Sequence, residues 1–142
     1  MKIRKATQKD VPRIVELLNS DANLTEDDEL PYTEKMIISY LKEQSNFMFV
    51  YELNSKILGV IMGFFWMQAK QCYMFDIVVD ENYRKKGIGK ALINYLENML
   101  KKNKIELIFF HSEEDNKIMH KASEKWGYKK GKKSYFFSKT LK

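Results

Sequence analysis

The sequence is poor in cysteine and has no long apolar run. Its single cysteine, Cys72, excludes a disulfide within the chain, which is typical of a protein that folds in a reducing compartment, and we expect a cytoplasmic location. No apolar run is long enough to span a membrane, and the residues after Met1 do not read as a signal peptide, so no membrane partner is expected. Cys72 lies in a strand pattern and is expected to pack there rather than to act as a nucleophile.

Repeats, linkers and low-complexity segments are also absent from the sequence. The chain has only two prolines and six glycines among 142 residues, which is enough for one domain and too few for two of typical size. Apolar residues make up 44% and charged residues 31%, as in ordinary globular proteins. We therefore expect a single domain over residues 1–142.

Negative charge is concentrated in one segment. Asp21–Glu34 holds six acidic residues and no Lys or Arg, so the rest of the chain carries a net charge of about +12 although the total is +6. Such a surplus suits either a nucleic acid or a ligand with several phosphates. Because no nucleic-acid motif is recognised, we favour the phosphate ligand and expect no nucleic-acid partner.

Alternating and helical apolar patterns predict the order β-α-α-β-β-β-α-β-α-β. Thr7 and Asp10 form a T-x-x-D helix start, and Thr33 can cap a second helix. The final strand is expected at Tyr128 and again over residues 134–141. This succession predicts an α/β fold with a central mixed sheet and helices on both faces. The other strands are expected at 1–6, 47–53, 57–66, 71–79 and 105–110. The later helices are expected from 87–90 onward and over 116–126.

A strand, a polar turn and a helix meet within residues 77–92, which read IVVDENYRKKGIGKAL. Apolar residues at helical spacing predict a helix that begins near Gly87–Lys90. The first N–H groups of a helix have no partner within it and carry the positive end of its dipole. Gly87 and Gly89 leave these groups uncovered, and basic residues surround them (Arg84, Lys85, Lys86 and Lys90). This arrangement favours a bound anion such as a phosphate or pyrophosphate.

Two common phosphate motifs do not fit this junction. A P-loop requires G-x-x-x-x-G-K-[ST], but Arg84 stands in the place of its first glycine and Ala91 follows Lys90. A dinucleotide fingerprint requires a third glycine where Leu92 stands. The sequence therefore excludes both standard forms of nucleotide loop.

The junction resembles the glycine motif of the GNAT (GCN5-related) N-acetyltransferases. Arg84–Gly89 matches their Q/R-x-x-G-x-G/A pattern, and Val78–Tyr83 is similar to their V-x-P-x-Y lead-in, with Asp80 in place of Pro. A second stretch, Asn116–Tyr128, resembles the family's N…A-x-Y-E-K-x-G-F signature, and the predicted element order is that of the GNAT fold. Two motifs in the right order make a chance resemblance improbable.

The resemblance implies acetyl-CoA as cosubstrate and no metal. It assigns the pyrophosphate to the glycine junction (Arg84, Lys85, Lys86, Gly87, Ile88, Gly89 and Lys90). It assigns the pantetheine arm to the preceding strand and to the last helix (Ile77, Val78, Val79 and Asn116). Ser123 stands where the family has a tyrosine that protonates the thiolate leaving group, and a serine hydroxyl is too short and too weak an acid to replace it directly.

The implied reaction is acetyl transfer to an amine, which needs a base for the ammonium proton and donors for the developing oxyanion. We expect the backbone N–H of Val78 to be such a donor. Two candidates for the base stay open: His111, at the end of the 105–110 strand, and Asp76, in the central strand. Glu113 is a weaker alternative, and His120 could lie near the sulfur or be exposed.

The resemblance leaves the acceptor amine and the oligomeric state open, a homodimer included. The acidic segment Asp21–Glu34 favours a cationic acceptor such as a polyamine, a peptide N-terminus or a lysine. Tyr32, Phe64, Phe65 and Trp66 could line its cleft. The alternative to an enzyme is a non-catalytic acetyl-CoA- or CoA-binding regulatory module on the same fold, which the serine at 123 would permit.

Overall fold

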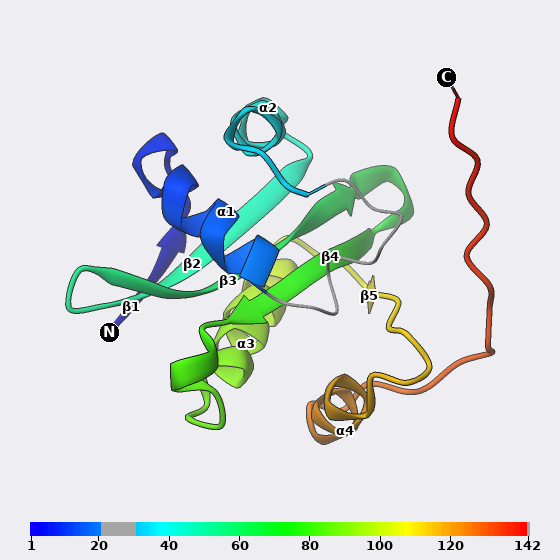
Figure 1. Ribbon diagram of the computed structural model, residues 1–142. Coiled ribbons are helices and arrows are strands. Elements are labelled where there is room, and N and C mark those ends of the chain that lie inside the picture. Colours follow the sequence, from blue (N-terminus) through cyan, green and yellow to red (C-terminus); the bar gives the residue numbers. More distant parts are fainter. Residues whose placement is uncertain (21–30, 142) are drawn as a thin grey trace.

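The computed structural model describes residues 1–20 and 31–141, and it contains five strands, four α-helices and three short 3₁₀ turns (Figure 1). The strands are β1 (Lys2–Lys5), β2 (Asn46–Leu53), β3 (Lys56–Trp66), β4 (Gln71–Val79) and β5 (Leu107–Phe109). The helices are α1 (Val11–Ser20), α2 (Glu34–Lys42), α3 (Ile88–Lys102) and α4 (Lys117–Lys125). The 3₁₀ turns are η1 (Gln8–Asp10), η2 (Met67–Ala69) and η3 (Glu81–Tyr83).

The five strands form one sheet in the order β1-β2-β3-β4-β5. The first four strands pair antiparallel with their neighbours, and β5 pairs parallel with β4. Helices α1 and α2 cover one face, and α3 lies against the other (Figure 1). The predicted mixed sheet with helices on both faces is confirmed. None of the helices in the described residues is long and apolar enough to cross a bilayer.

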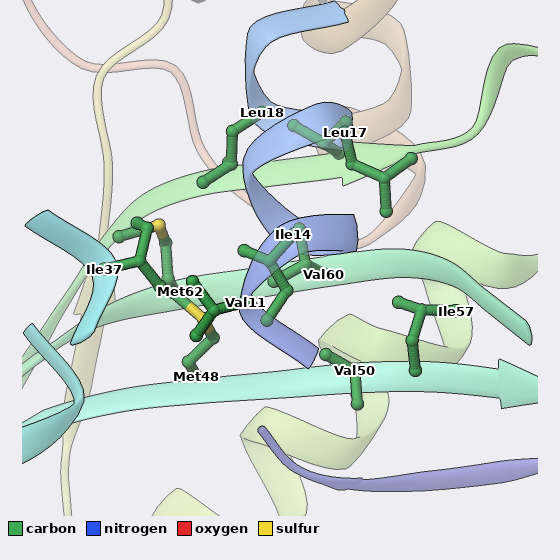
Figure 2. Packing of buried hydrophobic residues seen from close by; sticks show 11 residues of the cluster. Val11, Ile14, Leu17, Leu18, Ile37, Met48, Val50, Ile57, Val60 and Met62 are labelled. Carbon is green, nitrogen blue, oxygen red and sulfur yellow. The ribbon is translucent and has the colours of Figure 1, made fainter. Parts of the chain in front are cut away.

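The face under α1 and α2 holds an aliphatic core. In Figure 2 the side chains of Val11 and Ile14 from α1 lie over Val60 of β3, and Ile37 of α2 closes the side of the cluster. Helix α1 repeats apolar residues at the spacing of one helical face, which explains why Ile14 and the neighbouring turn are fully buried. This core holds α1 against β3.

The opposite face packs α3 and α4 against the sheet. Leu92 and Leu96 of α3 are fully buried among the strand residues, and Met119 and Trp126 of α4 pack against the same cluster. Cys72 belongs to this core, where burial raises the pKa of its thiol to about 12. A thiol of that pKa is protonated at neutral pH, so the predicted packing role of Cys72 is confirmed.

The helix starts follow the capping residues in the sequence. Thr33 Oγ1 accepts a hydrogen bond from the N–H of Met36 at 3.2 Å and begins α2 as predicted. Asp10 Oδ2 accepts from the N–H of Thr7 at 2.8 Å, which confirms that the T-x-x-D pattern marks the entry to α1, although a 3₁₀ turn precedes the helix. A helix end also follows the sequence: after the C-terminal end of α4, Gly127 adopts a positive φ of 89°.

The predicted final strand is wrong. Neither Tyr128 nor residues 134–141 belong to a strand, and Figure 1 shows this segment running apart from the sheet to the C-terminus. As a consequence β5 has only three residues and is the edge of the sheet rather than a buried strand, with Leu107 49% and Phe109 36% exposed. The alternation of residues 134–141 indicates strand propensity, but it does not supply the neighbouring strand that a ladder requires.

Candidate active site

The junction between β4 and α3 contains an open helix start. Gly87 precedes the helix at φ +83°, and a Cβ added there would meet no described atom within 4 Å. No side chain of the described residues caps α3. The first N–H groups of a fifteen-residue helix therefore face open space at the positive end of its dipole.

Basic side chains surround this helix start. The four predicted basic residues are all exposed (Arg84, Lys85, Lys86 and Lys90). Arg84 Nε donates to the carbonyl of Val79 at 3.1 Å, and Lys86 Nζ lies 5.1 Å from the centroid of the Tyr83 ring. These contacts hold two of the cations beside the loop, where they add to the attraction for an anion.

Two predicted loop residues have packing roles. The Ile88 side chain is buried in the α3 core and anchors the first turn of the helix. A Cβ at Gly89 would touch the Trp126 ring of α4 at 3.4 Å, so the absence of a side chain lets α4 lie close to the helix start. Ile88 can contribute to an anion site only through its backbone.

A β-bulge divides β4. Met62 pairs with Asp76 and Gly63 pairs with Met74, so Phe75 has no partner on β3. A Cβ at Gly63 would lie 2.0 Å from the carbonyl oxygen of Tyr73, which explains why glycine stands there. Gly63 therefore lies both beside a bulge and at a close approach of two backbones.

The hydroxyl of Tyr40 completes the hydrogen bonding at the bulge. The N–H of Gly63 donates to Tyr40 Oη at 2.8 Å, and Tyr40 Oη in turn contacts the carbonyl oxygens of Phe47, at 2.6 Å, and of Gly63. Tyr40 thereby satisfies a backbone donor of β3 on its β2-facing side. Burial of Tyr40 raises the pKa of its hydroxyl, which keeps it protonated. Tyr40 thus ties α2 to β2 and β3 at Gly63, the residue of β3 that lies beside the bulge.

Beyond the bulge, β4 has a partner on one side only. The ladder with β5 comprises three pairs, and the last joins Tyr73 to Phe109. Within the described residues, no strand pairs with the β5-facing side of β4 after that point. The N–H and C=O groups on that side have no strand partner, so a ligand that lies along the strand can bond to them; the Val79 carbonyl already accepts from Arg84 Nε.

The direction of each N–H in this segment follows from one hydrogen bond. The N–H of Asp80 donates to the carbonyl of Leu58 on β3 at 2.9 Å. Because successive residues of a strand point to opposite sides, Val78 also directs its N–H toward β3, and Ile77 directs its N–H away from it. The alternation favours Ile77 over the predicted Val78 as a donor to a bound oxyanion. The side chain of Val78 is buried under α1.

Asp76 lies at the start of this one-sided segment and has a tyrosine partner. Tyr32 Oη donates to Asp76 Oδ2 at 2.5 Å across 44 residues of sequence. Tyr32 in turn is held by Asn19 of α1, whose side chain bonds both the N–H and the carbonyl of Tyr32 at 2.9 Å. The carboxylate thus has a fixed position between β4 and the segment that leads into α2.

His111 also has a tyrosine partner but is exposed. Its Nδ1 lies 3.1 Å from Tyr73 Oη, beyond the end of β5. The charge of Asp76, after the larger effect of burial, raises the pKa of the Tyr73 hydroxyl, so these groups are near one another. Each candidate base thus has a tyrosine partner, Tyr32 for Asp76 and Tyr73 for His111, and sequence reasoning missed the role of Tyr73.

Aromatic rings line the sheet beside these polar groups. Tyr73 lies at the centre of the group, with ring centroids 4.9 Å from Phe75 and 5.1 Å from Phe109, and Phe64 lies 5.5 Å from Phe75. Phe75 is 46% exposed. We call these four residues the aromatic patch. Of the other predicted cleft residues, Phe65 packs against Phe47 and Trp66 is exposed.

Helix α4 carries the remaining predicted residues. Asn116 caps the helix, its Oδ1 accepting from the N–H of Met119 at 3.2 Å. The Ser123 hydroxyl donates to the carbonyl of Met119 at 2.6 Å and is buried, so it is engaged by its own helix. His120 is half-buried rather than exposed, with Nε2 2.8 Å from the carbonyl of Glu113, which is itself exposed in the loop before α4.

The geometry fits acetyl-CoA. The cradle at Gly87 and the cations around it suit a pyrophosphate, and the one-sided segment of β4 leads from there toward Asp76. The acidic segment Asp21–Glu34 lies outside the described residues apart from its last four. Among the residues that are described, no group of three or more His, Cys, Asp or Glu side chains could hold a metal ion.

Comparison with known proteins gives three consistent results. The model of the acetyltransferase (GNAT) family matches residues 11–128. An uncharacterized N-acetyltransferase of Methanocaldococcus jannaschii is 30% identical over 98 residues, which are 69% of this chain and 58% of that protein. The chain thus spans little more than half the length of this curated relative.

Solved structures with this fold include two acetyltransferases. An aminoglycoside acetyltransferase from an uncultured soil metagenomic sample, in complex with sisomicin, has a TM-score of 0.81 and 21% identity, with 99% of this chain and 96% of that chain covered. The ribosomal-protein alanine N-acetyltransferase of Escherichia coli has a TM-score of 0.76 and 19% identity, with 92% and 79% covered. The fold is that of these enzymes, and the chain belongs to the GNAT acetyltransferase family.

Proposed function

We propose that this protein transfers the acetyl group of acetyl-CoA to the amine of a cationic acceptor. The observation that carries the proposal is the course of β4. One strand connects an open, basic helix start to a carboxylate, and within the described residues no strand pairs with its β5-facing side between them. Bound acetyl-CoA supplies an activated acetyl thioester; the chain's own groups supply the rest.

The cofactor would be held by backbone and cations. The N–H groups at the start of α3, with Arg84, Lys85, Lys86 and Lys90, would bind the pyrophosphate. The N–H and carbonyl of Ile77, which both point away from β3, are suited to the pantetheine amides, and Asn116 lies at the start of α4. The Ile77 N–H is also our candidate donor to the acetyl oxygen as negative charge develops there.

Asp76 is the favoured base. Its carboxylate is next to Ile77 in sequence and is held in place by Tyr32, whereas His111 is exposed at a loop. A carboxylate there would attract an ammonium and accept its proton when the amine attacks.

The acceptor site would lie over the aromatic patch. Aromatic faces attract cations, and the patch adjoins the negative charge of Asp76, whose field reaches Tyr73. Lysine, a polyamine or a peptide N-terminus combines the positive charge and the apolar stem that this surface suits. Two of the solved structures with this fold belong to enzymes named for an aminoglycoside and for a protein alanine, both of which are amine acceptors.

The direct test measures thiol release from acetyl-CoA with a panel of polyamines, basic peptides and aminoglycosides. Release with at least one acceptor is expected. Failure with every acceptor, while acetyl-CoA still raises the melting temperature, would favour the alternative of a non-catalytic CoA-binding module. The observation that supports this alternative is the Ser123 hydroxyl, which donates within its own helix and so offers no acid to the leaving thiolate.

Cofactor binding is tested separately by Gly87→Ala. An alanine at φ +83° is strained, and the strain is expected to displace the helix start and raise the Kd of acetyl-CoA about tenfold, measured by calorimetry. Gly131→Ala is the matched control, since Gly131 also has open space around its Cβ position but no positive φ. Equal affinities in the two variants would contradict the proposed cradle.

A further inference from the structure

Tyr32 lies just before a helix and reaches the central strand. It stands next to Thr33, the residue that caps α2, and its ring packs against the aliphatic core under α1 and α2. Tyr32 is half-buried, and its hydroxyl donates to Asp76 Oδ2 at 2.5 Å. Because packing of the ring restricts its movement, the hydroxyl is held beside the carboxylate.

Helix α1 fixes the backbone of Tyr32 through Asn19. The Asn19 side-chain oxygen accepts from the Tyr32 N–H, and its amide nitrogen donates to the Tyr32 carbonyl, both at 2.9 Å. A side-chain amide can pair with a peptide group in this way because it carries both an acceptor and donors. Leu17 and Leu18 precede Asn19 and are buried, so this end of α1 is anchored in the core. A continuous set of contacts therefore runs from α1 through Tyr32 to β4.

The bond between Tyr32 and Asp76 favours a charged carboxylate. A phenol hydroxyl that donates to a carboxyl group stabilises its ionised form, since the neutral acid is a weaker acceptor. The separation of 2.5 Å lies in the range of such charge-assisted bonds. A base must be ionised before it can take a proton from an ammonium, so this bond prepares Asp76 for the role proposed above.

Two further tyrosines lie near Asp76 and are uncharged. Burial raises the pKa of the Tyr40 hydroxyl of α2 and of the Tyr73 hydroxyl of β4, and the charge of Asp76 adds to both shifts. Both hydroxyls are therefore protonated at neutral pH and carry no charge. Asp76 is itself half-buried, and burial favours the neutral form of a carboxyl group. The hydrogen bond from Tyr32 opposes that tendency.

We propose that Tyr32 is a positioning residue for acetyl transfer, and that its hydroxyl keeps Asp76 ionised and in one orientation while Asn19 holds its backbone. Tyr32 acts through Asp76 and does not itself exchange a proton with the acceptor. The inference rests on the proposed role of Asp76 as the base. It extends that role beyond β4, because the state of the carboxylate then depends on a residue before α2 and on a residue of α1.

The first test follows the protonation of Asp76 in the free protein, without acetyl-CoA or an acceptor. The carboxyl carbon-13 resonance of Asp76 is recorded between about pH 3 and pH 8 and is identified by its loss in Asp76→Asn. Tyr32→Phe keeps the ring but removes the donor, so the midpoint of this titration is expected to rise by about one pH unit. A midpoint that does not move would overturn the proposal.

Tyr128→Phe is the matched control for this measurement. The Tyr128 hydroxyl also donates to a carboxylate, Glu97 Oε1 of α3, at 2.9 Å, and its ring packs against the core on the other face of the sheet. Both variants therefore lose one bond between a tyrosine and a carboxylate and keep the ring. The control is expected to leave the Asp76 midpoint unchanged. An equal movement in both variants would show that the effect is not specific to Tyr32, and the proposal would fail.

The second test compares pH–rate profiles, with an acceptor that the unaltered protein acetylates. The acid limb of kcat for Tyr32→Phe is expected to move up by about one pH unit, so the loss of rate is about tenfold below the limb and small above it. The KM for acetyl-CoA should change by less than about twofold, because the glycine junction is left intact. A loss of equal size at every pH is what a merely structural role would give, and it would contradict the proposal.

Asn19→Ala tests the link to α1. The change keeps the Tyr32 hydroxyl but releases its backbone, so a smaller movement of the acid limb in the same direction is expected. Asn103→Ala is the control, since Asn103 Nδ2 also donates to a backbone carbonyl, that of Met99 at 2.8 Å, but at the end of α3. An unmoved limb in Asn19→Ala, or an equal movement in Asn103→Ala, would refute the part assigned to Asn19.

The two tests separate this inference from the proposed function. A shifted Asp76 midpoint in a protein that acetylates no acceptor would refute acetyl transfer and support the link between Tyr32 and Asp76. An unshifted midpoint in a protein that does acetylate an acceptor would refute the part assigned to Tyr32 and leave the proposed function standing.

Discussion

The two halves of β4 differ in their surroundings. Residues 71–73 have strand partners on both sides, β3 and β5, whereas residues 76–79 pair only with β3 within the described chain. The bulge at Phe75 separates them. The first half is structural, and its Cys72 and Met74 are buried; the second half carries Asp76 and the outward N–H of Ile77.

This difference shows how the fold creates a binding edge inside a sheet. An unpaired strand edge is normally a liability, because it offers backbone groups to any passing chain. Here α4 and the basic loop flank the opening, and the bulge at Phe75 follows the last residue of β4 that pairs with β5, Tyr73, by two positions. The predictions below alter the bulge, then the reactive group, then the supports of each half.

The largest effect is expected from Gly63→Ala. The new Cβ would lie 2.0 Å from the carbonyl oxygen of Tyr73 and 2.8 Å from the Phe47 ring, so the backbone of the bulge must move. We expect a loss of about 3 kcal/mol or more in the free energy of unfolding, measured by urea denaturation. Gly59→Ala is the control, since its Cβ would lie 3.1 Å from methyl groups of Ile88 and Leu92 and 3.3 Å from the carbonyl oxygen of Val78, a milder clash. Similar losses in both variants would show that the bulge is not specially restrictive.

The next largest effect is expected from Asp76→Asn. If Asp76 is the base, the amide cannot accept the proton, and kcat/KM for the acceptor should fall about 100-fold or more. His111→Gln should lower it by less than about tenfold, because His111 would act only through Tyr73. The two variants are compared at several pH values with the same acceptor. A larger loss for His111→Gln would reverse the assignment.

Much of the fold could be predicted because its signals are local. Thr33 begins α2, Gly87 precedes α3 and Asn103 follows it, all within a few residues of the groups that they serve. The tail could not be predicted, because residues 134–141 have strand character in any context and pairing depends on what lies beside them. The short, exposed β5 is a consequence of the same missing neighbour.

The candidate site was predicted where it follows from a motif and missed where it depends on tertiary contacts. The glycine junction is contiguous in sequence. Tyr32 and Tyr73 bond residues 44 and 38 positions away, and no local pattern indicates such partners. The choice between Ile77 and Val78 depends on which side of β4 faces β3, which one hydrogen bond of Asp80 reveals.

A smaller effect is expected from Tyr40→Phe. Tyr40 bonds to β2 and β3 at Gly63 and does not touch the cofactor loop. The change removes the acceptor of the Gly63 N–H and leaves that donor unpaired in a buried place. We expect a loss of about 1–3 kcal/mol in the free energy of unfolding by urea denaturation. Tyr95→Phe is the control, because the Tyr95 hydroxyl has no partner among the described residues and the ring contact with Phe49 is kept after the change. Equal losses would mean that the Tyr40 hydroxyl contributes little.

The smallest effect is the acid sensitivity of the support beneath residues 76–79. The N–H of Asn82, and then Arg13 of α1, lower the pKa of Asp80, whose Oδ2 lies 2.5 Å from Arg13 Nη2. A carboxyl with a lowered folded pKa stabilises the fold fully above its unfolded pKa of about 3.9, and this contribution is lost as the pH falls through the folded value.

Asp80→Asn should therefore lower the melting temperature at pH 7, and the difference from the unaltered protein should narrow as the pH falls below about 4. Glu16→Gln is the matched control, because Glu16 pairs with the same Arg13 but is 69% exposed and should change the melting temperature little at any pH. Melting curves at half-unit steps of pH measure both. A constant difference for Asp80→Asn across this range would mean that its ionisation does not stabilise the junction, and that the one-sided half of β4 is held by β3 and the core alone.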